Sequence, residues 1–450
     1  MYVLLHMLIA IPMGGIAQTL SLKEAVDSTL AHYPVLRERQ ADIARSRAHV
    51  TAVQDNRLPA LNLQEELTLG TNNSLDGAYF GLGVIPSTTG GVNGADIMQA
   101  NSGNIATAYL QWNFYTFGYY DALQKQALTE LAASRSALDR DRYLLSMQVI
   151  GLYLDALKKS RLLSVEVENM RRNSTILTAI RAIAAGGMRP GVDSVTAAAA
   201  YSDARVSYLK AQRAYTDDKI ALSIFTGLDT GRVDPDTTQG GLIDGDAVAS
   251  AVPLTHPLLD VYQKAYETSL AANRSVSRQY LPKVGLEASG WSRSSSIEPS
   301  GAYGDLSEGW GFQRYNYLFG LSVTYNLFDL KKRHDLLTEG RFDAQAKEAR
   351  LQEEQLRLDR MLVQANADYD NDIRQLEELG LQRSSAEQAY HQQLVMYQGG
   401  LNTLIDVTNA LYVLRQSESN YVVSEDQLLQ VLFTRAGLSN QLDTFLQTQK

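Results

Sequence analysis

Two long stretches of the chain carry apolar residues at helical spacing. Residues 119–185 and 332–398 contain no proline and little glycine, and alanine, leucine, arginine, glutamate and glutamine dominate them. Each stretch holds 67 residues, which span about 100 Å at the rise of an α-helix. A helix of that length cannot pack inside an ordinary globular domain. The pattern therefore predicts two helices that lie in a bundle or a coiled assembly.

Shorter helices are predicted beside the long ones. Residues 22–31 form an amphipathic pattern that stops near Pro34, where a second helix begins and runs to residue 56. Proline is favoured in a first turn because the N–H that it lacks would have no partner there. Residues 193–225 form a further helix. The helices at 34–56 and 193–225 together approach the length of one long helix, as expected if they stack end to end beside it.

The segments between the helices change from a period of 3.6 to a period of 2. Ala108, Leu110, Trp112 and Phe114 alternate with polar residues, and a second alternating run covers 317–327. This pattern is typical of strands with one apolar and one polar face. Partner strands are predicted near 59–70 and 282–292, although Glu65 interrupts the first of them. The glycine- and serine-rich stretches 70–103 and 290–311 are predicted to be long loops.

The landmarks of the first half return in the second half at two fixed offsets. Pro34 and Pro59 recur 223 residues later as Pro257 and Pro282. Further on, Asn113 and Asp193 recur 213 residues later, and the offset changes between Pro59 and Asn113, within a predicted loop. The chain therefore contains an internal duplication of about 210 residues, and both copies belong to one body.

The duplication and the apolar N-terminal segment together divide the chain into five predicted parts. An apolar run from Val3 to Met13, followed by small residues, predicts an exported protein whose signal peptide is cleaved before Gln18. The parts are a signal peptide at 1–17, a first repeat at 18–225, an equatorial linker at 226–255, a second repeat at 256–437 and a tail at 438–450.

Composition excludes several classes of function. The net charge is −9, and no clustered basic surface suited to nucleic acid is evident. Cysteine is absent, which excludes disulfides, thiolate metal sites and a cysteine nucleophile. The six histidines are scattered, and no catalytic motif is present. We therefore expect no enzyme activity, no cofactor and no metal site.

Four strands cannot close a barrel in a membrane. After Gln18 no stretch approaches the 18 or so apolar residues of a spanning helix, so any crossing must use strands. Membrane barrels need about eight strands, and open edges leave backbone groups unpaired in lipid. If these strands cross a membrane, two, three or four chains must share one barrel of eight, twelve or sixteen strands.

The ordered recurrence of these features resembles the outer-membrane efflux proteins, the TolC-like channels of Gram-negative bacteria. The resemblance rests on the duplication, the proline helix starts, the Leu-Pro entries into the strands and the Gly-x-x-x-x-x-Asp turns. It implies a mixed α and β fold: a homotrimer whose twelve strands form an outer-membrane barrel and whose helices form a periplasmic tube. It also implies an exit duct for small molecules or polypeptides in efflux or type I secretion, partnered by an inner-membrane pump, a periplasmic adaptor and outer-membrane lipid.

The turns after the long helices carry the most specific functional signal. An Asp near the following helix start is favoured by the helix dipole and can cap free N–H groups. By resemblance, Asp406 belongs to a carboxylate ring at the periplasmic mouth, and Asn409 occupies the site of a second ring. Tyr397 and Asp193 occupy positions that can hydrogen-bond and hold the mouth shut, and Asn402 replaces an arginine latch. The long helices end at Gly186 and Gly187 in the first copy and at Gly399 and Gly400 in the second.

One hypothesis from another class is an exported coiled-coil scaffold without channel activity. It explains the long helices but not the duplicated strand pairs with alternating faces.

Overall fold

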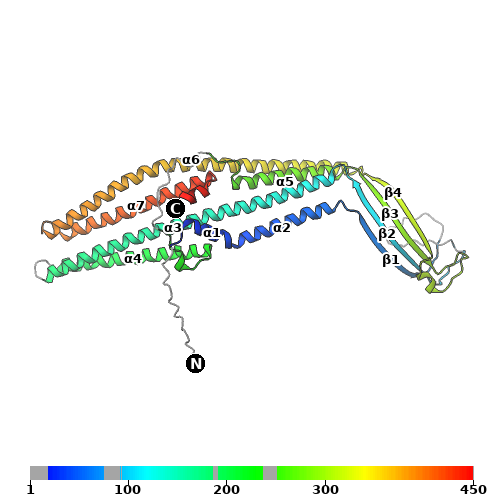
Figure 1. Cartoon of the computed structure of the whole chain (residues 1–450), viewed down its shortest axis with the longest axis horizontal. Helices are drawn as coiled ribbons and strands as arrows, with labels where there is room; N and C mark the ends of the chain where they lie inside the picture. The colour runs from blue at the N-terminus through cyan, green and yellow to red at the C-terminus, as the bar shows by residue number, and fades with distance from the viewer. Residues whose placement is uncertain (1–18, 75–91, 93, 186–190, 237–250, 449–450) are drawn as a thin grey trace, which may run out of the picture. The chain divides into compact units, whose positions relative to one another are not determined.

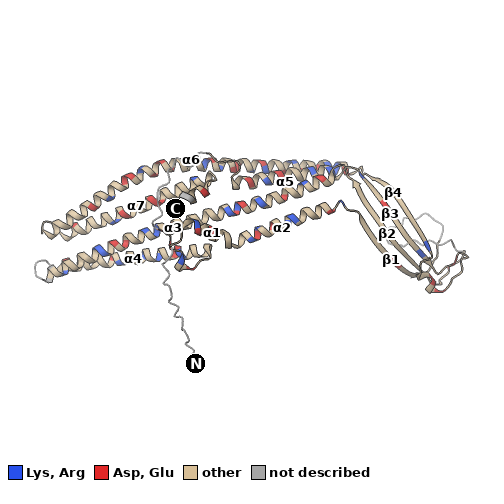
Figure 2. Cartoon of the chain, in the orientation of Figure 1, with Lys and Arg blue, Asp and Glu red and all other residues tan. Residues whose placement is uncertain are grey.

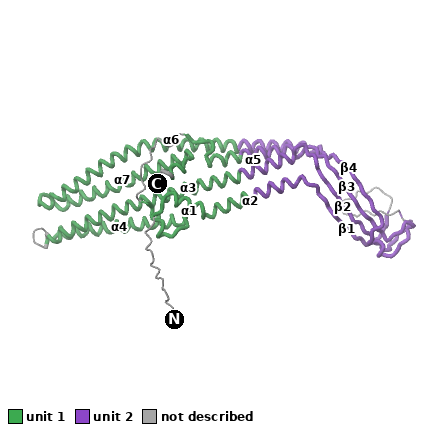
Figure 3. The backbone as a smooth tube through the Cα atoms, in the orientation of Figure 1, with its two compact units in different colours: residues 1–43, 133–265, 347–450 green, residues 44–132, 266–346 purple. Residues whose placement is uncertain are grey.

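The computed structural model describes residues 19–74, 92, 94–185, 191–236 and 251–448 (Figure 1). The chain divides into two compact units (Figure 3). Unit 1 comprises residues 1–43, 133–265 and 347–450, and unit 2 comprises residues 44–132 and 266–346. The predicted signal peptide at 1–17 lies outside the described residues, as does much of the predicted linker.

Nearly all of the described residues of unit 1 that lie in regular structure are helical. The helices that lie in it or contribute to it are α1 (Leu22–His32), α2 (Pro34–Asp55), α3 (Tyr119–Ala185), α4 (Gly191–Thr226), α5 (Pro257–Gln279), α6 (Asp329–Gln398), α7 (Leu404–Leu438) and α8 (Leu442–Thr448), with a short 3₁₀ turn η1 (Thr230–Arg232). The long helix predicted at 119–185 is confirmed. The second long helix begins three residues earlier than predicted, at Asp329, whose negative charge is favoured in a first turn. No described helix is both long and apolar enough to cross a bilayer.

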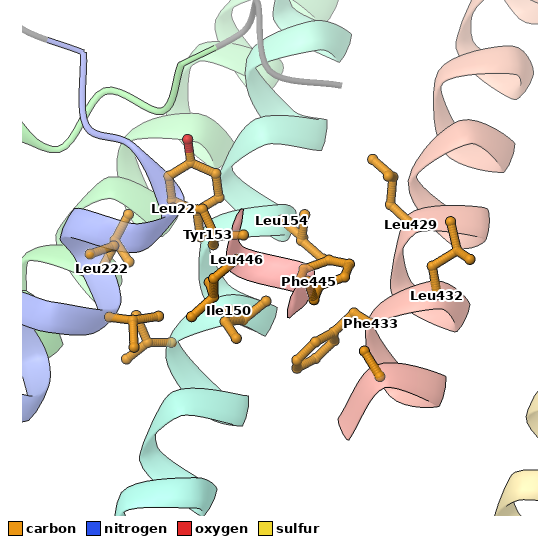
Figure 4. Packing of buried hydrophobic residues seen from close by; sticks show 14 of the residues in the cluster. Leu22, Ile150, Tyr153, Leu154, Leu222, Leu429, Leu432, Phe433, Phe445 and Leu446 are labelled. Carbon is orange, nitrogen blue, oxygen red and sulfur yellow. The ribbon is translucent and has the colours of Figure 1, made fainter. Parts of the chain in front are cut away.

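The largest core of unit 1 joins both ends of the described chain to its middle (Figure 4). Helices α1, α3, α4, α7 and α8 all supply apolar side chains to it. Tyr153 is 2% exposed at the centre of this core. Its hydroxyl donates to Leu20 O at 2.9 Å and accepts from the Asp236 N–H at 3.1 Å. The buried phenol is therefore satisfied by the N-terminal segment and the linker, which it ties together. The labelled core residues are Leu22, Ile150, Tyr153, Leu154, Leu222, Leu429, Leu432, Phe433, Phe445 and Leu446.

A fully buried histidine fastens the start of α5 to the end of α7. His256 Nδ1 accepts a hydrogen bond from the Leu258 N–H at 3.2 Å, and Nε2 lies 3.1 Å from Gly437 O. These partners assign a neutral ring that carries its proton on Nε2. The Tyr143 ring packs edge-on at 4.9 Å. The histidine thus satisfies one free N–H of α5 and one carbonyl of α7 with a single side chain.

Unit 2 contains one antiparallel sheet of order β1-β2-β3-β4. The predicted four strands per chain are confirmed. Pairing runs without interruption from β1 to β2 and from β3 to β4, and an irregularity lies between Trp112 and Tyr115 where β2 meets β3. The strands are β1 (Ala60–Gly70), β2 (Asn101–Tyr115), β3 (Lys283–Ser295) and β4 (Arg314–Thr324).

The register shows that the sheet has an apolar face and a polar face. Directly paired residues share a face, and successive residues alternate between faces. The apolar face carries Leu61, Leu63, Leu67, Leu69, Ala106, Ala108, Leu110, Trp112, Leu286, Ala288, Tyr315, Tyr317, Phe319, Leu321 and Val323, with Glu65, Ser102, Asn104, Ser292 and Ser294 as polar exceptions. The opposite face carries Asn62, Gln64, Glu66, Thr68, Thr107, Tyr109, Gln111, Glu287, Ser289, Arg293, Asn316, Ser322 and Thr324, with Ile105, Trp291 and Leu318 as apolar exceptions.

The strands near the outer loops are longer than predicted. Residues 290–295 belong to β3 and residues 101–103 to β2, so both loop predictions were wrong at those ends. Backbone pairing between these two segments overrides their glycine and serine content. Glu65 interrupts the apolar alternation of β1 but not the strand itself, because its backbone lies in the uninterrupted pairing with β2, opposite Ala106. The Asn104 side-chain amide donates to Glu65 Oε1 at 3.3 Å. The second loop also contains a 3₁₀ turn, η3 (Leu306–Trp310).

The buried histidine makes the stability of unit 1 depend on pH. Burial holds the pKa of His256 below its usual 6.5, which outweighs the hydrogen bond to Gly437. The unfolded chain therefore binds a proton that the folded chain does not, so stability should decrease as the pH falls below about 6.5. His256→Asn keeps a capping side chain and should weaken this dependence in thermal unfolding measured from about pH 7.5 to pH 5. The exposed His334→Asn is the control, and equal pH dependence in all three proteins would contradict the assignment.

Candidate functional site

The turn between α6 and α7 closes the end of a long helix through its backbone. Gly400 adopts a positive φ of 77°, a conformation that favours glycine. The Leu401 N–H donates to Met396 O at 2.9 Å, and the Gly400 N–H donates to Tyr397 O at 3.1 Å. This is the Schellman pattern of a helix C-terminus. The predicted helix end at Gly399 and Gly400 is confirmed, whereas Gly186 and Gly187 lie outside the described residues.

Asp406 caps the start of α7 together with Thr403. The Thr403 hydroxyl and N–H donate to Asp406 Oδ2 at 2.6 and 2.9 Å, and the Asp406 N–H lies 3.4 Å from Thr403 Oγ1. This capping box confirms the helix-start role predicted for Asp406. The hydrogen bonds from the Thr403 hydroxyl and backbone lower the pKa of Asp406, so the carboxylate is charged at neutral pH. Asn409 lies three residues on, on the same exposed side of α7.

Asn402 fastens the turn to the helix before it. Its side-chain amide donates to Gln393 O at 3.0 Å and to Gln393 Oε1 at 2.5 Å. Asn402, at the position where the resemblance implies an arginine latch, therefore bonds to the last turns of α6. Sequence reasoning did not predict this contact.

Tyr397 lies in an apolar cluster that four helices share. The ring is 5% exposed, and the cluster draws on α3, α4, α6 and α7. Asp193 occupies the first turn of α4. Its hydrogen bond to Tyr397 stays a prediction. The cluster comprises Ile176, Leu177, Ile180, Ala197, Ala386, Tyr390, Tyr397, Leu404, Val407, Leu411 and Leu414.

A seam of ion pairs joins α3 to α7 above this cluster, and sequence reasoning missed it. Both helices carry charges of both signs along their length (Figure 2). The Arg172 guanidinium meets both carboxylate oxygens of Glu418 at 2.8 and 2.9 Å. These two side chains are only 15% and 17% exposed. The other pairs are Lys158–Asp426 at 3.0 Å, Arg161–Glu425 at 2.9 Å and Arg415–Glu166 at 2.8 Å.

The seam separates two apolar contacts between the same helices. On one side lies the core around Tyr153, and on the other lies the cluster around Tyr397. Buried ion pairs contribute little net stability, but their partners must match in position. The seam therefore fixes the register of α3 against α7. Its signal in the sequence is a set of complementary charges on two helices that are 246 residues apart at the Arg172–Glu418 pair.

Comparison with known proteins identifies the family. The profile of the outer membrane efflux proteins matches residues 25–228 and 254–434. The chain belongs to the outer membrane efflux protein family. No protein of curated function matches it in sequence. The mixed α and β fold predicted for the chain is confirmed, and its family consists of outer-membrane channels.

Solved structures share the fold at low sequence identity. The outer membrane protein VceC of Vibrio cholerae is 17% identical with a TM-score of 0.73, over 92% of this chain and 96% of that chain. The CmeC outer membrane channel of Campylobacter jejuni is 12% identical with a TM-score of 0.75, over 95% and 89%. The open-state MtrE outer membrane channel of Neisseria gonorrhoeae is 16% identical with a TM-score of 0.69, over 94% and 89%.

A double-mutant cycle tests the seam. Arg172→Met should lower stability by about 2 kcal/mol, because it leaves the mostly buried Glu418 without its partner. Glu418→Met should lower stability by less, because Arg172 keeps a second ion pair with Glu168 at 3.3 Å. The double variant should lose less than the sum, and thermal unfolding of the intact protein measures all three. Arg171→Met is the control, since Arg171 pairs with Glu168 at the surface of the same helix. Strictly additive losses would show that the pair does not couple α3 to α7.

Proposed function

We propose that this chain forms the outer-membrane channel of a tripartite efflux or type I secretion assembly. Three copies would close one twelve-stranded barrel, and the helices would form a periplasmic tube that meets a periplasmic adaptor and an inner-membrane pump. The cargo, small molecules or polypeptides, would enter at the turn between α6 and α7 and leave through the barrel.

The four-stranded sheet is the main observation that supports this proposal. β1 and β4 each pair on one side only among the described strands, and the apolar face is exposed in the single chain. Tyr317, Phe319 and Leu321 on that face are 79%, 72% and 75% exposed. Such a face fits lipid, and the opposite face fits a water-filled lumen. A secreted coiled-coil scaffold has no need of such a sheet. The number three comes from the family.

The turn supplies the mouth of the channel in this proposal. One Asp406 carboxylate from each copy would lie around the axis and concentrate negative potential there. Asn409 would place neutral amides where a second acidic ring could lie. Tyr397 and Asp193 would hold the mouth closed, and the Asn402–Gln393 contact would stiffen the turn.

Engineered cysteines test the shared barrel, because the natural chain has none. Gln64→Cys on β1, combined in turn with Asn316→Cys, Leu318→Cys, Gly320→Cys or Ser322→Cys on β4, places both thiols on the polar face. At least one combination should give a covalent trimer on oxidation in outer-membrane fractions, because β4 of one copy would pair with β1 of the next. In the control, Gln64→Cys is combined with Thr107→Cys on the interior strand β2 in place of a cysteine on β4. A folded, membrane-inserted monomer would overturn the proposal.

Single-channel recordings in planar bilayers test the mouth. Asp406→Asn should reduce cation selectivity and weaken block by multivalent cations, with little change in conductance, since it removes charge but keeps a capping oxygen. Thr403→Val is the control, because it disrupts the same cap and keeps the charge. In the same recordings Tyr397→Phe should raise the open probability. If selectivity and block are unchanged in Asp406→Asn, the residue is a helix cap alone.

A further inference from the structure

The apolar face of the sheet contains a hollow of about 690 Å³. Its floor is formed by residues with little or no side chain, Ala106, Ala108 and Gly290. Leu63 on β1 and Tyr315 on β4 stand on either side. The residues at the intermediate positions point to the other face, so they contribute backbone to the hollow. A depression of this volume on an apolar face can accommodate a linear hydrocarbon chain.

Two polar groups sit at one end of the hollow, on the same face. Glu65 lines it, and its only hydrogen bond from the described residues comes from the Asn104 side chain at 3.3 Å. Ser292 lines it as well, is 7% exposed, and its hydroxyl has no hydrogen-bond partner among the described residues. A carboxylate and an unsatisfied buried hydroxyl are costly on a face that lipid covers. Ser292 therefore lacks a partner within the described chain, and Glu65 has oxygen lone pairs left to accept hydrogen bonds from a ligand.

The position along the strands indicates the membrane leaflet. Glu65, Ala106, Ser292 and Tyr315 form one row across the sheet, because each is paired with the next. In β2, β3 and β4 this row lies nine residues from the end of the strand that connects with the helices, and one to five residues from the loop end. In β1 the row lies midway, five residues from each end. The polar end of the hollow is therefore in the outer half of the sheet.

The loop that contains η3 packs on the sheet beyond this row. The Ser294 hydroxyl donates to Glu308 O at 2.8 Å, and the Asn104 amide donates to Trp310 O at 3.2 Å. Ser102 and Gly309 pack so closely that a Cβ on Gly309 would lie 2.0 Å from the Ser102 hydroxyl oxygen. The Ser294 hydroxyl and the Asn104 amide group beyond the row thus donate to the loop, whereas Glu65 and Ser292 line the hollow.

We propose that this hollow binds one acyl chain of an outer-leaflet glycolipid, whose amide N–H and hydroxyl groups bond to Glu65 and Ser292. An amide-linked hydroxyacyl chain carries these donors beside its carbonyl, at the boundary between headgroup and hydrocarbon. A phospholipid of the inner leaflet would place its headgroup at the opposite end of the strands. The inference rests on the proposed function in one respect, that the apolar face meets lipid.

Native mass spectrometry of the purified trimer titrated with lipid A tests the inference, with phosphatidylethanolamine as the inner-leaflet lipid. Glu65→Leu removes the polar contact, and Ala108→Phe fills the hollow. Each should weaken lipid A binding by about tenfold or more. Glu66→Leu and Thr107→Phe are the matched controls. Glu66 is the chain neighbour of Glu65, Thr107 is the chain neighbour of Ala108, and both lie on the opposite face of the sheet. The controls should bind lipid A as the parent does.

Equal lipid A binding in the parent, Glu65→Leu and Ala108→Phe would overturn the inference, as would equal binding of phosphatidylethanolamine with the same dependence on the two positions. Ala106→Leu replaces Ala108→Phe if the latter yields no trimer. Channel conductance of each variant is recorded in parallel. Loss of lipid binding with conductance retained supports the site, whereas a parent that forms neither trimer nor channel refutes the proposed function instead.

Discussion

The rest of this molecule depends on one requirement: the backbone groups at the edges of the sheet must form hydrogen bonds. Each edge of a four-stranded sheet leaves a row of backbone N–H and C=O groups without partners, and lipid offers none. β1 and β4 are the two edge strands, and nothing in the described chain pairs with their outer sides. The alternation of faces makes the same demand from the side chains, since an apolar face as exposed as that around Tyr317 is not stable in water. Association with further copies would answer both demands, and the internal duplication gives each copy two hairpins, β1-β2 and β3-β4.

The contact between α3 and α7 solves a different problem in unit 1. Purely apolar contacts between two long helices tolerate sliding, because one hydrophobic side chain can replace another. The four ion pairs between the two apolar clusters have no such freedom, since a shift of one turn would bring Arg172 away from Glu418 and leave both charges mostly buried. Water can replace the ion pairs more readily than it can enter the apolar clusters. The helices are thus held in one register by a contact that can be exchanged for solvent if they separate.

The sequence predicted the elements well and the long-range contacts poorly. The bounds of α3 follow from the absence of proline and from local pattern, and these are properties of one segment. The last residues of β3, 293–295, were missed because the stretch that contains them is rich in serine, and they become a strand only through pairing with β2. At the turn, the role of Asp406 as a cap was predicted from its place at a helix start. The ion pairs of the seam depend on which helix faces which, and no single segment carries that information.

The duplication also explains why the two aspartates of the turns are not equivalent. Thr403 supplies a hydroxyl and an N–H to Asp406, and both bonds end on Oδ2. The position 213 residues earlier than Thr403 is Pro190, which has neither a hydroxyl nor an N–H. Asp193 therefore lacks the two donors that hold its counterpart, although both residues occupy the first turn of a helix. The sequence difference between Thr403 and Pro190 is therefore enough to give the two aspartates different partners at their helix starts.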